Sequence, residues 1–237
     1  MESIRETTGS CRNHANQAGE FFNKLSPAAL HDLNSMQFPS SYAANVVLFS
    51  EKDAVNGIFF VLEGEVKLSI NSSEGRRLSL SIARKGEILG LASTLSGTPY
   101  DVTAETLYPV KVAHIGRREF LGFLARHPEA YQTVIEELSR SVSKACDQLR
   151  TVGLSATAPE KLARLLLEWS DSGQATECGG ARFRFSLTHE EIGEFIGASR
   201  ETVTRTLTTF KTRRLVAFQG SMLTIPSRTA LANYAHA

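Results

Sequence analysis

A segment near the C-terminus, Ser186–Val216, carries polar side chains at a spacing that suits contact with the bases of DNA. Its sequence is SLTHEEIGEFIGASRETVTRTLTTFKTRRLV. Arginine can donate two hydrogen bonds to guanine O6 and N7, and glutamate can accept one from cytosine N4. Side chains in the first turns of a helix that enters a major groove N-terminus first meet base edges first. The outward residues at the start of the second helix are Arg200, Glu201, Thr204 and Arg205.

Two short helices joined by a tight turn must position these side chains. Gly197 is expected at the turn, which needs a backbone free of a Cβ atom. Ser199 is expected to be the N-cap of the second helix, and Val203 and Leu207, four apart, to hold its inner face. The apolar residues expected to pack the first helix inward are Leu187, Ile192, Phe195 and Ile196.

Positive charge gathers on the same segment. The chain as a whole has a formal net charge of only +1, so it is not a general polycation. From Ser199 to Arg214, however, five basic residues accompany one acid, Glu201, an excess of four. Attraction for backbone phosphates is expected to concentrate here. A pair of surface helices with solvated charges is the alternative that the pattern leaves open.

Two runs in this segment closely resemble the DNA-binding motif of the Crp/Fnr superfamily, the cyclic-AMP receptor and fumarate/nitrate-reduction regulators. They are Thr-His-Glu-Glu-Ile-Gly at 188–193 and Gly-Ala-Ser-Arg-Glu-Thr-Val at 197–203, followed by Arg205. The resemblance, looser over about residues 20–232, implies a transcription factor that binds double-stranded DNA at an inverted repeat of TGTGA-like half-sites. It assigns base contacts to Arg200, Glu201 and Arg205, and phosphate contacts to Thr188, Ser199 and Thr202.

Length and composition are those of a globular protein. A chain of 237 residues, 42% hydrophobic and 22% charged, can form one or two domains with proper cores. No run of about 18 apolar residues occurs, so no membrane span is expected. The N-terminal sequence also lacks the apolar core of a signal peptide. Three separated cysteines, Cys11, Cys146 and Cys178, indicate reduced thiols in a cytoplasmic protein.

A strand-rich domain is predicted over residues 43–115. Several short strands separated by glycines argue for a small β-roll or barrel, with a hairpin turn at Asn71–Gly75. The pattern Gly-x-Phe-Phe-Val-Leu-x-Gly-x-Val resembles the cyclic-nucleotide-binding roll, a double-stranded β-helix. A helix over Ser26–Met36, capped by Ser26, is expected before it. The predicted strands begin at Asn45, Gly57, Val66 and Leu78.

A long helix follows, with small or apolar residues at alternating spacings of four and three, the pattern of a coiled-coil seam. From Pro128 to Val152 such a helix would be about 37 Å long. We expect the seam to form a homodimer, because a recognition helix needs a two-fold partner to span a palindrome. Packing of the helix on its own domain is the alternative. The seam residues are Tyr131, Ile135, Leu138, Val142, Ala145, Leu149 and Val152.

The remaining chain is predicted to form a winged helix-turn-helix domain. A helix over Ala158–Trp169 precedes a polar loop, Ser170–Gly180, that could contact RNA polymerase. A short strand is expected at residues 181–185 and a hairpin at 215–225. Gln219, beside the turn of that hairpin, is expected to contact a phosphate.

The predicted fold is therefore α+β, with an N-terminal β-roll, a long dimerisation helix and a C-terminal winged helix-turn-helix. The expected divisions are an N-terminal tail (1–19), the sensor domain (20–127), the dimerisation helix (128–152) and the DNA-binding domain (153–237). Glycine, serine and proline interruptions place a hinge at Thr151–Ala158.

The cassette that holds a cyclic nucleotide in relatives differs here. The resemblance places Leu91 where the family has a ribose-binding glutamate, and Asp101 where it has a phosphate-binding arginine. A carboxylate repels a phosphate instead of attracting it. We therefore expect an effector other than cyclic AMP, or none, and no resident cofactor. The residues assigned to this degenerate pocket are Gly90, Leu91, Asp101, Val102, Ala145 and Cys146.

A redox or haem signal is a further alternative. Cys-Arg-Asn-His at 11–14 looks like a degenerate form of the cysteine array of the Fnr branch, with His14 and Asn23 where cysteines would stand. An iron–sulfur cluster needs four ligands, usually thiolates, and the count fails. Haem ligation stays open, although the histidines have no spacing that favours it.

Enzyme activity is not expected. The six histidines form no metal-ligand motif, and neither a G-x-S-x-G motif nor a P-loop occurs. A cupin-type metal site would need histidines on neighbouring strands, where only His114 is available. A nucleotide-binding interaction module without DNA binding is the remaining rival. It predicts that Arg200→Ala has no effect, whereas DNA binding predicts a loss of roughly 1–3 kcal/mol.

Overall fold

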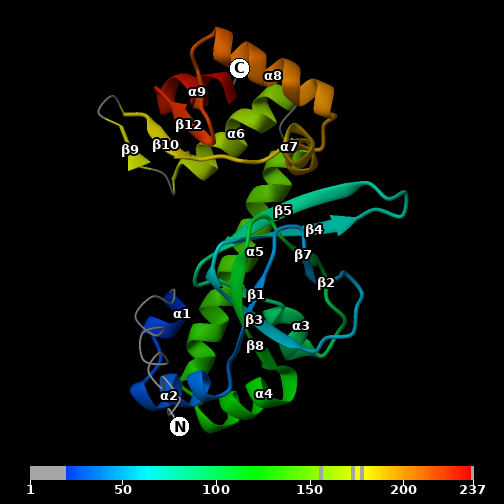
Figure 1. Cartoon of the computed structure of the whole chain (residues 1–237), viewed down its shortest axis with the longest axis vertical. Coiled ribbons are helices and arrows are strands. Elements are labelled where there is room, and N and C mark those ends of the chain that lie inside the picture. The colour runs from blue at the N-terminus through cyan, green and yellow to red at the C-terminus, as the bar shows by residue number, and fades with distance from the viewer. Residues whose placement is uncertain (1–19, 155–156, 172–173, 177–178, 236–237) are drawn as a thin grey trace, which may run out of the picture. The chain divides into compact units, whose positions relative to one another are not determined.

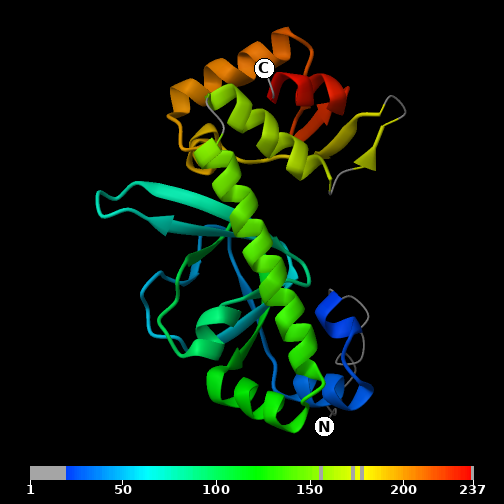
Figure 2. The ribbon, with the colours of Figure 1, turned by 180° about the vertical axis from the view of Figure 1, so that it is seen from behind.

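A computed structural model describes residues 20–154, 157–171, 174–176 and 179–235 (Figures 1 and 2). The chain divides into two compact units. The first holds the described residues up to Leu68 together with Ile82–Val142, and the second holds Ser69–Ser81 together with those from Ser143 onward. The predicted tail (1–19), with Cys11 and His14, lies outside the described residues, as do Cys178 and positions 155–156 of the predicted hinge.

Two four-stranded sheets make up the predicted β-roll. Their strand orders are β1-β8-β3-β6 and β2-β7-β4-β5. The turn predicted at Asn71–Gly75 links β4 to β5, and this hairpin is the part that clusters with the second unit. The strands are β1 (Phe38–Tyr42), β2 (Val47–Phe49), β3 (Gly57–Glu63), β4 (Glu65–Asn71), β5 (Arg77–Arg84), β6 (Ile88–Leu89), β7 (Thr103–Thr106) and β8 (Val110–Gly116).

The two faces of strand β3 pack into two different hydrophobic clusters. Because successive side chains of a strand point to opposite faces, Phe59 and Val61 join a cluster that also draws on Phe49 and Tyr100. Ile58 and Phe60 instead join a second cluster with residues of the surrounding helices, among them Phe21, Leu33, Phe120 and Val134. The continuous apolar run of β3 is therefore explained by burial on both of its faces.

Among the described residues, four helices precede the long one: α1 (Glu20–Asn23), α2 (Pro27–Ser35), α3 (Leu91–Ser96) and α4 (Arg117–Arg126). The predicted cap of α2 is confirmed, since Ser26 Oγ accepts a hydrogen bond from the Ala29 N–H at 3.2 Å. Proline at the first position of α2 lacks the N–H that a helix start leaves unpaired.

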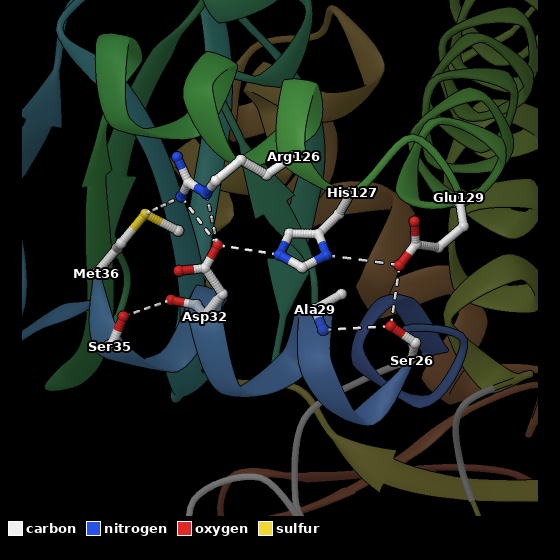
Figure 3. Close-up of polar contacts among 8 residues, drawn as sticks. All are labelled: Ser26, Ala29, Asp32, Ser35, Met36, Arg126, His127 and Glu129. Carbon is white, nitrogen blue, oxygen red and sulfur yellow. Dashed lines mark hydrogen bonds and ion pairs between the residues drawn. The ribbon is translucent and has the colours of Figure 1, made fainter.

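An ion-pair cluster, drawn in Figure 3, joins α2 to α4 and to the start of the next helix. Arg126 Nη2 lies 2.8 Å from Asp32 Oδ2, and His127 Nε2 lies 3.0 Å from the same oxygen. His127 Nδ1 lies 3.6 Å from Glu129 Oε1, and Ser26 Oγ donates to that carboxylate at 2.9 Å. The hydrogen bond from Arg126 is the main cause that lowers the pKa of Asp32 below its ordinary value.

Helix α5 (Ala130–Leu154) is the long helix of the sequence prediction. It begins and ends two residues later than expected, so the predicted break at Gly153 is wrong. A glycine inside a helix costs only about 1 kcal/mol relative to alanine, and this one lies within the last turn. Residues 151–154 of the predicted hinge therefore belong to α5.

The second unit contains a winged helix-turn-helix. Its sheet has the order β11-β12-β10-β9, and Trp169 of α6 packs on Phe185 and Phe195 at ring-centroid distances of 5.3 and 5.1 Å. The predicted hairpin is confirmed, with Gly220 at φ +58° in its turn. The elements are α6 (Ala158–Ser170), β9 (Gln174–Ala175), β10 (Ala181–Arg184), α7 (His189–Ile196), α8 (Arg200–Thr212), β11 (Ala217–Gln219), β12 (Met222–Ile225) and α9 (Arg228–Ala235).

Two strands lie outside the segments that were predicted to hold strands. Strand β1 pairs with β8 along the edge of its sheet, where Pro39 is tolerated. Strand β9 lies within the segment predicted as the polar loop Ser170–Gly180 and pairs with β10. Among the described residues, no helix is both long and apolar enough to cross a membrane.

Candidate nucleic-acid interface

The helix-turn-helix is fixed by capping at both ends of α7. Thr188 and Glu191 form a capping box, in which the Thr188 hydroxyl accepts from the Glu191 N–H at 3.2 Å and Glu191 Oε2 accepts from the Thr188 N–H at 2.8 Å. Gly197 ends the helix at φ +63°, in the left-handed region expected for the turn. Ala198 N–H then donates to the Gly193 carbonyl at 3.0 Å.

Gly193 is a second glycine that the turn requires. A Cβ atom at this position would lie 2.5 Å from the Ala198 carbonyl oxygen, far closer than such atoms approach. The close crossing of the turn over α7 therefore depends on Gly193 as well as on Gly197.

Helix α8 is amphipathic, as predicted. Val203, Thr206, Leu207 and Phe210 are buried, and Ser199 caps the helix by accepting from the Thr202 N–H at 3.3 Å. The three residues predicted to contact bases, Arg200, Glu201 and Arg205, are all exposed in its first two turns. The structure thus exposes all three side chains near the N-terminus of α8.

The carboxylate of Glu201 is held in the ionised form that can accept from cytosine N4. The hydrogen bond from its own backbone N–H is the main cause that lowers the pKa of Glu201. The Ser199 hydroxyl and the Arg200 charge lower this pKa further. The helix N-terminus, with its unpaired N–H groups, favours the same negative charge.

The residues predicted to contact phosphates are also engaged within the motif. Thr188 serves the capping box, and Ser199 caps α8. Thr202 Oγ1 lies 3.2 Å from Ser199 Oγ and accepts from Arg205 Nη2 at 3.4 Å. Gln219 is exposed beside the wing turn, where its Oε1 accepts from Arg182 Nη2 at 3.2 Å. Their predicted phosphate contacts stay predictions.

Two arginines of the second unit were not singled out by the sequence reasoning. Arg182 and Arg184 are exposed on β10, whose alternate residues Ala181 and Phe183 are buried. Lys211 Nζ, at the end of α8, lies 4.6 Å from the centroid of the Phe218 ring. An apolar–basic alternation at 181–185 was the signal available for the two arginines.

The predicted dimer seam lies along α5. Tyr131, Ile135, Val142 and Leu149 are large apolar side chains that are 47–69% exposed. Ala145 is exposed as well, Val152 is half-buried, and the half-buried Leu138 packs against the helical core of the first unit. Four large apolar side chains at spacings of four and seven thus lie uncovered on one helix.

The effector cassette of the first unit holds four of the six predicted pocket residues. Gly90 precedes α3 at φ +73°, where a Cβ atom would lie 2.7 Å from the Tyr100 ring. Leu91 is buried, Val102 packs partly on the core between the sheets, and the exposed Asp101 accepts from Ser93 Oγ at 3.4 Å.

Tyr100 fills the core beside this cassette. Its ring stacks on Phe49 with centroids 4.0 Å apart, and its hydroxyl lies 2.7 Å from the Gly57 carbonyl. Burial is the main cause that raises the pKa of Tyr100. Ala145 and Cys146, the other two predicted pocket residues, are exposed on the part of α5 that belongs to the second unit.

Metal ligands do not gather in the described part of the chain. Within it, no group of three or more histidine, cysteine, aspartate or glutamate side chains could hold a metal ion. His114 lies against Phe59, and burial is the main cause that lowers its pKa.

Comparison with known proteins matches both units. Residues 39–127 match the cyclic nucleotide-binding domain, and residues 160–234 match the Crp-like helix-turn-helix domain. The chain is 25% identical over 214 residues to the CRP-like cAMP-activated global transcriptional regulator of Mycobacterium tuberculosis, covering 90% of this chain and 95% of that protein. It is 27% identical over 207 residues to the transcriptional activatory protein AadR of Rhodopseudomonas palustris, covering 87% and 85%.

Solved structures show the same fold. FixK2 from Bradyrhizobium japonicum superposes with a TM-score of 0.74 at 22% identity, covering 85% of this chain and 98% of that one. A CooA mutant from Carboxydothermus hydrogenoformans gives a TM-score of 0.72 at 19% identity, covering 98% of each chain. The α+β architecture expected from sequence is therefore confirmed.

Proposed function

Since the chain belongs to the Crp/Fnr family of DNA-binding transcription regulators, we propose that it acts as a homodimer on an inverted repeat of TGTGA-like half-sites, without a requirement for cyclic AMP. Arg200, Glu201 and Arg205 are the proposed base contacts. The observation that carries this proposal is their common exposure in the first two turns of α8, immediately after the cap at Ser199.

The half-site is the one that the family resemblance implies, and the chemistry of these side chains suits it. A guanidinium suits guanine, and the ionised Glu201 suits cytosine N4. Each G·C pair of TGTGA offers a guanine on one strand and a cytosine on the other. The hydroxyls of Ser199 and Thr202 and the backbone around them are proposed to hold neighbouring phosphates and so fix the register of α8 on the duplex.

The homodimer is proposed to form along α5. Uncovered Tyr131, Ile135, Val142 and Leu149 would become buried if two copies of the helix packed in parallel. A two-fold dimer also supplies the second recognition helix that an inverted repeat demands, about one helical turn of DNA away. Ile135→Asp together with Leu149→Asp is expected to give a monomer in light scattering, and a persisting dimer would refute this seam.

Independence from cyclic AMP rests on the cassette. A buried Leu91 offers no hydrogen bond to a ribose, and the exposed Asp101 would repel a phosphate. Tyr100 and Phe49 occupy the adjoining core. An effector of another kind, signalling by a small molecule or by redox or haem chemistry, is the alternative that these residues leave open.

RNA polymerase is the further proposed partner, as expected of a transcription regulator that acts at promoters. The polar segment Ser170–Gly180 is the proposed contact, and Asp171, Gln174 and Ala175 within it are exposed. We propose no enzymatic activity and no resident cofactor.

The deciding experiment is fluorescence anisotropy on a labelled TGTGA-N6-TCACA duplex and on a scrambled duplex, each with and without saturating cyclic AMP. The proposal predicts tight binding to the palindrome alone, unchanged by the nucleotide. Binding that appears only with cyclic AMP would contradict the proposal that Leu91 and Asp101 leave no site for this nucleotide. Equal affinity for both duplexes would overturn the proposed half-site.

A further inference from the structure

The C-terminal part of α5 buries polar side chains. Within residues 143–154, the buried side chains are those of Gln148 and Thr151, each 5% exposed. A buried amide is costly unless it is hydrogen-bonded. The Gln148 side chain uses both of its N–H donors, since Nε2 donates to the Ser79 carbonyl at 2.9 Å and to the Phe195 carbonyl at 2.8 Å. Gln148 therefore joins α5 to β5 and to α7.

Both carbonyls lie where regular structure leaves an acceptor unpaired. Phe195 belongs to the last turn of α7, and the final four carbonyls of a helix have no partner within it. Ser79 belongs to β5, the last strand in the order β2-β7-β4-β5, and an edge strand presents carbonyls that no further strand pairs. A primary amide carries two donors. Gln148 can thus supply both acceptors at once and hold the edge of β5 at the end of α7.

Further contacts support the same junction. The Ser79 hydroxyl, which is fully buried, donates to Glu194 Oε2 at 2.9 Å. A Cβ atom at Gly197 would lie 3.9 Å from Val152 Cγ1, an ordinary contact distance, so α5 also packs on the turn that leads into α8. We call the following residues the hairpin bridge: Ser79, Gln148, Glu194 and Phe195. All four belong to the second unit.

The strands of the β4–β5 hairpin run through both units. Ser69–Ser81 clusters with the second unit, whereas Glu65–Leu68 of β4 and Ile82–Arg84 of β5 belong to the first. No loop interrupts either strand at these boundaries. A displacement in the sheet of the first unit can therefore reach Ser79 along β5 itself, and Gln148 connects Ser79 to α7.

We propose that Gln148 is a positioning residue for DNA recognition, which couples the β4–β5 hairpin to the helix-turn-helix through the end of α7. This role rests on the proposed DNA binding through α8 and adds a route by which the first unit regulates it. While the hairpin bridge is closed, it fixes the end of α7 and the turn that carries α8. Coupling of this kind is reciprocal, so DNA bound to α8 must also stabilise the hairpin.

Reciprocity separates such coupling from a purely structural role. The test is hydrogen exchange, measured by mass spectrometry on the full chain without DNA, with saturating TGTGA-N6-TCACA duplex and with a scrambled duplex. The amides followed are those of the hairpin, Ser69–Ser81, and of α7 with its turn, His189–Ser199. Exchange reports the local opening of each segment.

Three variants accompany the unmodified chain. Gln148→Met removes both donors and keeps the length of the side chain. Ser79→Ala removes the hydroxyl that contacts Glu194 but keeps the carbonyl that Gln148 contacts. Gln132→Met is the matched control, since Gln132 lies on the same helix, is exposed and donates to Glu136 at 3.4 Å. Thermal unfolding of each variant checks its fold.

Without DNA, Gln148→Met should exchange about tenfold faster in both segments, because two buried carbonyls lose their donor. Ser79→Ala should give a smaller increase in the same two segments, and Gln132→Met should change neither. Faster exchange in one segment alone would overturn the proposal. This arm tests the hairpin bridge whether or not the chain binds the duplex.

With the palindromic duplex, exchange in the unmodified chain should slow in both segments. In Gln148→Met the duplex should slow exchange only in His189–Ser199, and its affinity should fall by about fivefold or more. Undiminished protection of the hairpin in this variant would overturn the proposal, as would an unprotected hairpin in the unmodified chain bound to the palindrome. Failure of the unmodified chain to prefer the palindrome over the scrambled duplex would instead count against the proposed function.

Discussion

The cations of the α2–α4 cluster and the cations of β10 and α8 have partners that differ in charge. In the cluster of Figure 3, Arg126 and His127 both contact the carboxylate of Asp32. In the second unit, four cations of β10, α8 and its C-cap lie against neutral partners, although Arg228 of α9 contacts Asp171. Arg182 contacts an amide, Arg205 a hydroxyl, and Lys211 and Arg213 lie over aromatic rings.

The difference separates two uses of the same side chain. A guanidinium closed on a carboxylate fixes two helices to each other and leaves little charge for a further anion. A guanidinium held by a hydroxyl, an amide or a ring is oriented while its charge remains. The second arrangement suits a surface that binds a polyanion, and the first suits the attachment of one helix to another in the first unit.

The largest expected effect on stability comes from removing a buried side chain on the inner face of α8. Phe210 is fully buried and meets the Tyr234 ring edge-on at 5.2 Å. Phe210→Ala should destabilise the second unit by about 3–5 kcal/mol and abolish specific DNA binding. Calorimetry should show a lower unfolding temperature for the transition of the second unit only. The urea midpoint of the first unit, followed by a probe in the α2–α4 cluster, should stay unchanged. A uniform shift of both units would show that they unfold as one.

The next effect concerns a base contact. Arg200→Ala should weaken binding to the palindrome by roughly 1–3 kcal/mol, because an exposed donor to base edges is removed from the first turn of α8. Anisotropy measures the change, with Arg76→Ala as the control that removes an equal charge. Equal losses for the two variants would mean that Arg200 contributes only general charge.

Two helix caps give a matched pair of smaller effects, one from each region. Ser26→Ala and Ser199→Ala each remove a side-chain acceptor for a helical N–H, from Ala29 and Thr202. Each should cost about 0.5–2 kcal/mol of stability. Only Ser199→Ala should also weaken DNA binding, since it loosens the turn that carries Arg200. A similar loss of DNA binding for Ser26→Ala would contradict the claim that only the cap of α8 affects DNA binding.

The smallest effect is the pH dependence of the ion-pair cluster. Because the folded-state pKa of Asp32 is lowered, its contribution is fully present above the ordinary value of 3.8 and is lost as pH falls through the lower folded-state value. The stability difference between the unmodified chain and Asp32→Asn should therefore shrink below about pH 4. Urea unfolding at pH 7 and in acid measures it, and a difference that grows in acid would refute the assignment.

The helix-turn-helix could be predicted from sequence because its determinants are local. Thr188, Gly197 and Ser199 act on neighbours within a few residues. The pairing of Arg182 with Gln219 could not be predicted, because 37 residues separate them and only the register of three strands brings them together. The end of α5 was misplaced for another reason, since a single glycine at 153 is too weak a signal to end a helix.

The central claim is that α8 contacts particular bases through Arg200. It is tested most directly by measuring the unmodified chain and Arg200→Ala on a set of duplexes in which each base pair of TGTGA is replaced in turn. The account predicts that the variant loses discrimination at one G·C pair and keeps it at the others. A loss of affinity that is the same on every duplex would contradict it.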